Sequence, residues 1–222
     1  RGYIATGQSS QAVSVLQTYT IYAPNDTSAY LVLGEAYNAA GQYQMAVDTL
    51  NKAVDANRRD PDSYTQRGYA YFYLQQASLA VADFRLATAY NPSDFDAQLG
   101  LARALDLQKK PGDAYVQIEQ RVSSLAKTNA TKAQVYYYEA VYLEEIGDKL
   151  SLQGADNDWN KLIALPADVM PLDWRNQAFQ YLNITPTYTP TVIPTIIQKY
   201  TSTPTPMFTE PLALIGTPTV TP

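Results

Sequence analysis

Acidic side chains form the patterns in this sequence that come nearest to metal-binding or acid–base chemistry. The segment 154–158, GADND, gathers two aspartates and an asparagine, and oxygen ligands of this type bind calcium. It lacks the sixth-position glycine and the closing glutamate of an EF-hand loop, so we interpret it as a turn at a helix start and keep calcium binding as the alternative. Glu144 and Glu145 are interpreted as a solvated helix face, because carboxylate pairs act on a substrate only across a cleft.

The inventory of residue types removes most other chemistry. The 222 residues include no cysteine and no histidine, which excludes zinc fingers, thiol nucleophiles and catalytic histidines. A net charge of −5 without clustered lysine and arginine argues against nucleic acid as a partner, and no apolar run approaches the roughly 20 residues that span a bilayer. We therefore predict a protein with no catalytic role, no cofactor and no metal, whose partners are other proteins.

A repeat of 34 residues sets the order of the structural elements. Large, small and aromatic residues recur at this spacing: Tyr30, Leu33, Gly34, Tyr37, Gly41, Ala46, Leu50 and Ala53 correspond to Tyr64, Arg67, Gly68, Tyr71, Gln75, Ala80, Phe84 and Ala87. Spacing at i, i+3, i+4 and i+7 within each half-unit is the signature of an amphipathic helix. The pattern resembles the tetratricopeptide repeat, in which two antiparallel helices stack on the next pair to form a continuous core.

This resemblance implies an all-α, helix-turn-helix superhelical solenoid over residues 1–183. Unit three is looser than the first two, and unit four is expected to start near Ala133, four residues late. The expected divisions are a half-repeat at 1–26, repeats at 27–60, 61–94, 95–132 and 133–170, a terminal helix at 171–183 and an extended Thr/Pro-rich tail at 184–222.

The first helices of such units line a concave face that usually binds an extended peptide. By register, the residues of this groove are Leu31, Glu35, Asn38, Thr65, Tyr69, Phe72, Tyr73, Leu99, Arg103 and Asp106. The face is aromatic and mixed in charge, which suits a polyproline II ligand, and it lacks the Lys, Asn and Arg set that clamps a terminal carboxylate. Alternatively, any one of these residues belongs to the core between units.

The tail combines proline and threonine with apolar residues. Eight of the fourteen prolines lie in 184–222, where Lys199 and Glu210 are the only charged residues, so we expect extended chain rather than helix. One interpretation is a stalk like those of extracytoplasmic bacterial surface proteins. The other is docking on a neighbouring subunit, and the residues expected in that contact are Val192, Ile193, Ile196, Ile197 and Tyr200.

Half-repeats at both ends suggest how subunits could join. The first 26 residues hold little more than the second helix of a unit, and residues 171–183 hold a first helix. A head-to-tail contact would bring Ala12, Leu16 and Tyr19 of one subunit against Trp174, Ala178 and Tyr181 of the next; the alternative is an ordinary capping helix. We therefore predict a structural subunit of a bacterial extracellular filament, with a monomeric peptide-binding adaptor tethered to the cell surface as the alternative.

Overall fold

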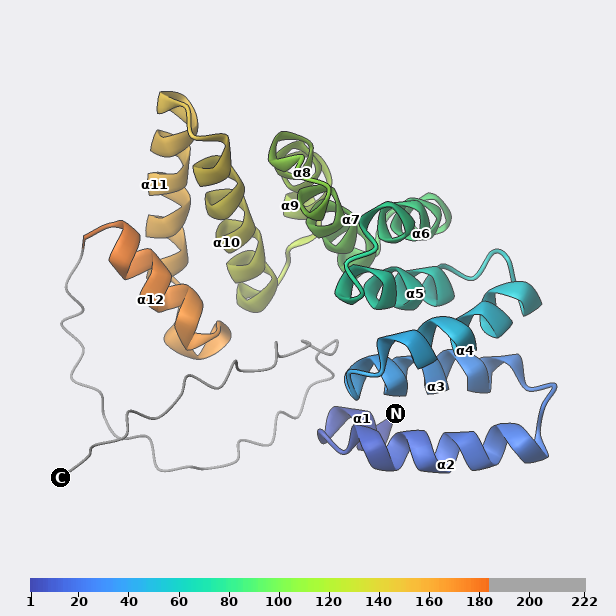
Figure 1. The fold of residues 1–222 in the computed structure, drawn as a ribbon. Coiled ribbons are helices and arrows are strands. Elements are labelled where there is room, and N and C mark those ends of the chain that lie inside the picture. Colours follow the sequence, from blue (N-terminus) through green and yellow to red (C-terminus); the bar gives the residue numbers. More distant parts are fainter. Residues whose placement is uncertain (184–222) are drawn as a thin grey trace, which may run out of the picture.

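The computed structural model describes residues 1–183, and these residues form helices without any strand (Figure 1). The helices are α1 (Gly2–Ala5), α2 (Ser9–Tyr22), α3 (Thr27–Ala39), α4 (Tyr43–Ala56), α5 (Pro61–Tyr73), α6 (Ala77–Tyr90), α7 (Phe95–Leu107), α8 (Pro111–Gln117), η1 (Ile118–Val122), α9 (Ser123–Leu125), α10 (Asn129–Ile146), α11 (Lys149–Ala164), η2 (Ala167–Val169) and α12 (Leu172–Tyr181). The tail 184–222, with the predicted docking residues Val192, Ile193, Ile196, Ile197 and Tyr200, lies outside the described residues.

Successive antiparallel helix pairs follow one another along an arc (Figure 1). Each pair contacts its neighbours, and α5 also packs directly on α3 and α7, so the first helices of the units form one continuous surface. That surface lies on the inner side of the arc, while α6, α8 and α11 lie on its outer side (Figure 1). The all-α solenoid predicted from the repeat is confirmed. Within residues 1–183 we find no helix with the length and apolarity needed to cross a bilayer.

Side-chain caps start the first helices of the units at a constant spacing. Asp26, Asp60 and Asp94 accept backbone hydrogen bonds at the starts of α3, α5 and α7, and Thr128 forms a capping box with Thr131 at the start of α10. Such caps satisfy amide groups that have no partner within the helix. The four capping residues are spaced 34 residues apart along the chain, so the repeat is written into the helix starts as well as into the core.

Unit four begins earlier than expected. Helix α10 starts at Asn129, four residues before Ala133, and it has 18 residues where α7 has 13. The helix therefore starts in step with the other units, and its extra length moves its packing residues later in the chain. The segment η1 before it is a π-helix, a form that accommodates an inserted residue. Together these features explain why the sequence pattern loses register after residue 110.

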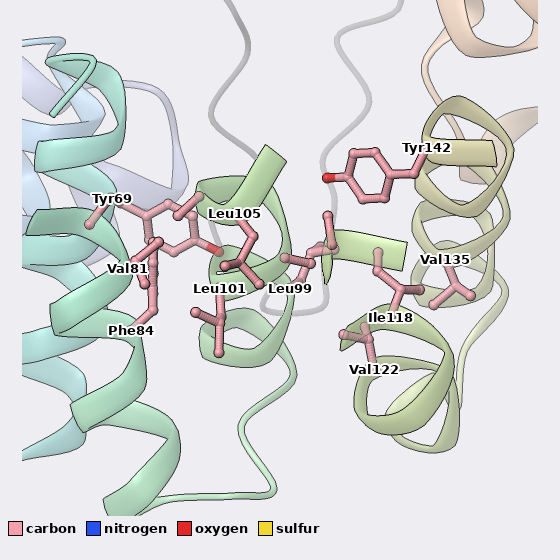
Figure 2. Close-up of a cluster of buried hydrophobic side chains, with 14 of the residues drawn as sticks. Tyr69, Val81, Phe84, Leu99, Leu101, Leu105, Ile118, Val122, Val135 and Tyr142 are labelled. Atoms are coloured by element: carbon pink, nitrogen blue, oxygen red, sulfur yellow. The ribbon is translucent and has the colours of Figure 1, made fainter. Parts of the chain in front are cut away.

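The core runs continuously between units because small residues let helices approach. A Cβ on Gly34 would lie 2.4 Å from Leu50 Cγ, and one on Gly100 would lie 2.4 Å from Phe84 Cε1. Leu50 and Phe84 are completely buried at these contacts. Figure 2 shows α7 between two sets of side chains in the largest cluster: Leu99, Leu101 and Leu105 lie between Tyr69, Val81 and Phe84 on one side and Ile118, Val122, Val135 and Tyr142 on the other.

Two sequence interpretations of acidic residues are wrong. The segment 154–158 lies in the middle of α11, whose N-cap is Asp148, so it is not a helix-start turn. The helix continues through it because Ala155, Trp159 and Leu162 form its buried stripe. Glu144 is not simply solvated either, since the Trp159 indole N–H donates to its carboxylate. Among residues 1–183, no group of three His, Cys, Asp or Glu side chains is placed to hold a metal ion.

Candidate functional site

The predicted groove residues divide into a buried and an accessible set. Asn38, Thr65, Tyr69 and Leu99 are buried. The Asn38 amide donates to the Gln66 carbonyl at 2.8 Å, and the Tyr69 hydroxyl donates to the Asp96 carbonyl at 2.9 Å, so both connect neighbouring units. The partly exposed set is Leu31, Glu35, Phe72, Tyr73, Arg103 and Asp106. The accessible chemistry of the inner surface therefore lies mainly on α5 and α7.

Arg103 is the centre of this inner surface. Its guanidinium carbon lies 4.6 Å from the Phe72 ring centroid and 5.5 Å from the Tyr138 ring centroid. Burial disfavours the charge, but the phenolic oxygens around it, that of Tyr138 first, outweigh burial and raise the pKa of Arg103. No ion pair joins Arg103 to a carboxylate within residues 1–183. A positive charge is thus held between aromatic rings on the inner surface, stabilised by cation–π contacts.

Tyr142 of α10 adds an unused hydrogen-bonding group. The residue is 1% exposed, and its hydroxyl has no hydrogen-bond partner. Figure 2 shows this hydroxyl pointing from α10 toward α7, the helix that carries Arg103. Burial raises the pKa of Tyr142 well above its ordinary value, so the hydroxyl keeps its proton and can donate it. A buried hydroxyl without a partner costs about 1–3 kcal/mol, which a ligand oxygen would recover.

An acidic pair lies beside Arg103 and Tyr142. Burial, and then the neighbouring carboxyl group of Asp106, raise the pKa of Glu145, whereas Lys109 lowers it. Asp106 also contributes to the raised pKa of Tyr142. Two carboxylates this close repel each other, and a positively charged ligand group would relieve that repulsion.

We call the group Arg103, Phe72, Tyr138, Tyr142, Asp106 and Glu145 the Arg103 site. Its α10 members were missed by sequence reasoning because unit four was left out of the groove. Adding 39 residues to Leu99, Arg103 and Asp106 gives Tyr138, Tyr142 and Glu145, so the signal was present at a shifted register. The longer α10 and the π-helical η1 account for the shift from 34.

Family comparison agrees with this architecture. Sequence models described as tetratricopeptide repeat match residues 3–65 and 65–130. Together they span well over half of the chain. The chain belongs to the tetratricopeptide repeat family. The tetratricopeptide fold is a scaffold for protein–protein interaction, and proteins built on it generally have no catalytic activity of their own.

Solved structures show the same fold. A thermophilic tetratricopeptide repeat protein of Thermus thermophilus is 18% identical with a TM-score of 0.64, and the match covers 81% of this chain and 93% of that one. A crystal structure of MamA is 20% identical with a TM-score of 0.62, covering 81% of this chain and 96% of that one. No curated protein matches the sequence.

The predicted N-terminal contact surface lies on α2 of the tetratricopeptide array. Ala12 is buried and Leu16 half-buried, whereas Tyr19 is exposed, and its hydroxyl donates to Asp26 Oδ2 at 2.8 Å. Large apolar side chains are exposed on the same helix: Val15, Tyr19, Ile21 and Tyr22. A shallow apolar pocket of about 290 Å³ lies between α2 and α3 and is lined in part by Val15, Leu16 and Tyr19. The array therefore presents an apolar surface at its first helix.

The predicted C-terminal contact residues pack within their own chain. The Trp174 ring stacks on Tyr137 with 4.2 Å between centroids, and Ala178 is completely buried. The Tyr181 ring centroid lies 6.0 Å from that of Trp159. These contacts place α12 against α11 as a cap on the last buried cluster. Only the outer side of α12 is free to meet another molecule.

A polar pocket lies on the other side of α10, away from the Arg103 site. Glu139 is half-buried there, accepts a hydrogen bond from Ser123 Oγ at 2.9 Å, and faces the ion pair in which Lys161 Nζ lies 2.7 Å from Asp158 Oδ1. Burial, and then the charge of Asp158, raise the pKa of Glu139 to about 7. The same Ser123 hydroxyl donates to the carbonyl of Ile118, the first residue of η1. The pocket thus connects the π-helical segment to α10 and α11.

Proposed function

We propose that this protein is a non-enzymatic interaction scaffold whose concave face binds an extended polypeptide at the Arg103 site. The observation that carries the proposal is the pairing of Arg103, which has no carboxylate partner in residues 1–183, with the unpartnered Tyr142 hydroxyl. Both groups donate hydrogen bonds, so they fit a backbone carbonyl or an acidic side chain. Phe72 and Tyr138 add aromatic faces on which proline rings pack.

Peptide selection tests this proposal without assuming the partner. A display library of random 12-residue peptides is panned on the full chain, with Arg103→Met as the counter-selection target. Methionine keeps the length of the arginine stem and removes the charge, and circular dichroism confirms that the variant folds. We expect peptides that lose at least about tenfold in affinity on Arg103→Met, since a hydrogen bond to a charged group contributes about 1.5–3 kcal/mol. Selected peptides that bind both proteins equally would place the binding surface elsewhere.

A second candidate function is self-assembly, which the exposed apolar surface of α2 supports. Val15, Tyr19 and Tyr22 form a surface that a second subunit could cover. In this proposal subunits join head to tail, through α2 of one and the outer side of α12 of the next, into a filament with the tails laid on neighbouring subunits. Tyr22→Lys should then lower the particle mass measured by light scattering at high concentration, and an unchanged monomer mass in wild type would rule assembly out.

We place the protein outside the cytoplasm, at the bacterial cell surface or in the extracellular space. Support for this comes from the Thr/Pro-rich composition of residues 184–222, which is typical of surface stalks, and from the absence of cysteine. Detection of the chain in the surface-exposed fraction of intact cells after mild protease treatment is the expected result. Full protease protection until the cells are lysed would refute the placement.

A further inference from the structure

We infer that the chain's own tail occupies the Arg103 site, with Lys199 on the carboxylates of Asp106 and Glu145. This inference rests on the proposed function, because it assigns an occupant to the same concave site. The segment concerned is 194–206, PTIIQKYTSTPTP. It binds intramolecularly and competes with any external partner of the scaffold.

Charge complementarity selects this segment. Lys199 is the only basic residue in 184–222, and Glu210 is the only acidic one. The Arg103 site presents two neighbouring carboxylates, Asp106 and Glu145, with Lys109 as the nearby basic group. An ammonium group placed between two close carboxylates removes their mutual repulsion, and one exposed lysine does not fully balance two negative charges.

The residues around Lys199 fit the rest of the site. Pro194 precedes the lysine, and Pro204 and Pro206 follow it, so the segment favours the extended conformation that aromatic grooves bind. Each proline also leaves the preceding backbone carbonyl without competition from an adjacent N–H donor. Such carbonyls are the acceptors that the Arg103 guanidinium and the Tyr142 hydroxyl lack.

The tail is long enough to reach the site within one molecule. Lys199 lies 16 residues after Asn183, the last described residue, and an extended proline-rich segment rises about 3.1 Å per residue, which gives a reach of about 50 Å. Helix α10, which carries Tyr138, Tyr142 and Glu145 and packs on α11 next to α12, is 18 residues or about 27 Å long. A tether of this length keeps the local concentration in the millimolar range, which favours the molecule's own tail over that of a second copy.

Chymotrypsin cleavage of the full chain tests the inference. The enzyme cuts after aromatic residues, so Tyr200 reports on the bound segment and Phe208 on the tail beyond it. Four full-length proteins are compared: wild type, Glu145→Lys, Lys199→Glu and the exchanged pair carrying both changes. Glu119→Lys, an exposed acidic site on the opposite side of α10, is the control. Synthetic peptides 190–206 with lysine or glutamate at position 199 correct for the preference of the enzyme.

Cleavage after Tyr200 should be slower in the wild-type chain than in the matching free peptide, relative to cleavage after Phe208. Each single charge reversal should raise it about two- to fivefold, the change that one exposed ion pair produces, and the exchanged pair should restore wild-type protection. Equal rates in wild type and free peptide, or no effect of Lys199→Glu, would overturn the inference. Protection that disappears on hundredfold dilution would also overturn it, because binding within one molecule is independent of concentration.

Failure of this inference is distinguishable from failure of the proposed function. The peptide library is panned on Lys199→Glu in parallel with wild type. If the tail occupies the site, the released variant binds the selected peptides more tightly than wild type does. A freely cleaved tail together with Arg103-dependent peptides would reject only the tail as occupant, whereas no Arg103-dependent peptide on either protein would reject the concave binding site itself.

Discussion

Replacing Glu139 by glutamine should change how the stability of the protein depends on pH. Glu139 accepts a hydrogen bond from Ser123 and lies near Asp158, and these surroundings together with burial raise its pKa to about 7 from a usual value of 4.5. The folded protein therefore binds this proton more tightly than the unfolded chain does. The contribution of the protonated group to stability is fully present below about pH 4.5 and is lost as the pH rises to about 7.

The size of the effect follows from the pKa difference. A difference of about 2.5 units corresponds to about 3 kcal/mol at 1.36 kcal/mol per unit. Because the carboxyl keeps some contact with solvent, we expect about 2 kcal/mol. Glutamine keeps the oxygen that accepts from Ser123 and removes the charge, so Glu139→Gln should be about 2 kcal/mol more stable than wild type at pH 8 and about equal to it at pH 4.5.

Urea denaturation followed by circular dichroism at pH 4.5, 6 and 8 measures this difference. Other groups with raised pKa values, among them Glu35 and Glu144, change the stability of both proteins alike and cancel in the comparison. Glu119→Gln, an exposed change at the same pocket, should stay within about 0.5 kcal/mol of wild type at each pH. A stability difference between Glu139→Gln and wild type that does not vary with pH would refute the reasoning.

Three further substitutions test the packing and the site. Gly34→Ala should destabilise the protein by about 1–3 kcal/mol in urea denaturation, because the new Cβ meets Leu50 at 2.4 Å, whereas Gly112→Ala, which meets nothing within 4 Å, should be neutral or slightly stabilising. Asp83→Asn should cost about 3 kcal/mol, since the mostly buried Arg67 guanidinium pairs with this carboxylate at 2.7 and 2.8 Å; the exposed Asp48→Asn is the control, and equal effects would refute the role of the ion pair. Tyr142→Phe should leave the melting temperature unchanged or raise it, because the lost hydroxyl has no partner, and should weaken the selected peptides in calorimetric titration; a large loss of stability would mean that the hydroxyl is bonded within the fold.

The sequence was sufficient for the repeat architecture because its signals are local and periodic. Gly34 and Gly68 mark close helix contacts, and residues such as Leu50 and Phe84 fill the space between units, so the 34-residue spacing predicts the stacking of α3 to α6. The caps at Asp60 and Asp94 repeat at the same interval. Each of these features depends only on residue type and spacing.

The candidate site was predicted only in part because its α10 half depends on non-local geometry. Arg103 was expected on the concave face, but Tyr138, Tyr142 and Glu145 were not, since the π-helical η1 and the longer α10 change the register. The sequence also could not show that Asn38 and Leu99 are buried by their neighbours, because burial depends on how closely adjacent units approach. The packing of Trp174 on Tyr137 is likewise a tertiary contact without a local signal.

Photo-crosslinking from the two faces of the solenoid tests the central claim that the concave face is the binding surface. A photoreactive phenylalanine analogue is placed in the full chain at Tyr73, beside the Arg103 site, or at Leu79, an exposed residue of α6 on the outer side. Peptides selected on the full chain are added, and crosslinked positions are mapped by mass spectrometry. The account predicts products from position 73 that map to an extended peptide segment and fall in yield on Arg103→Met. Equal or greater yield from position 79 would contradict it.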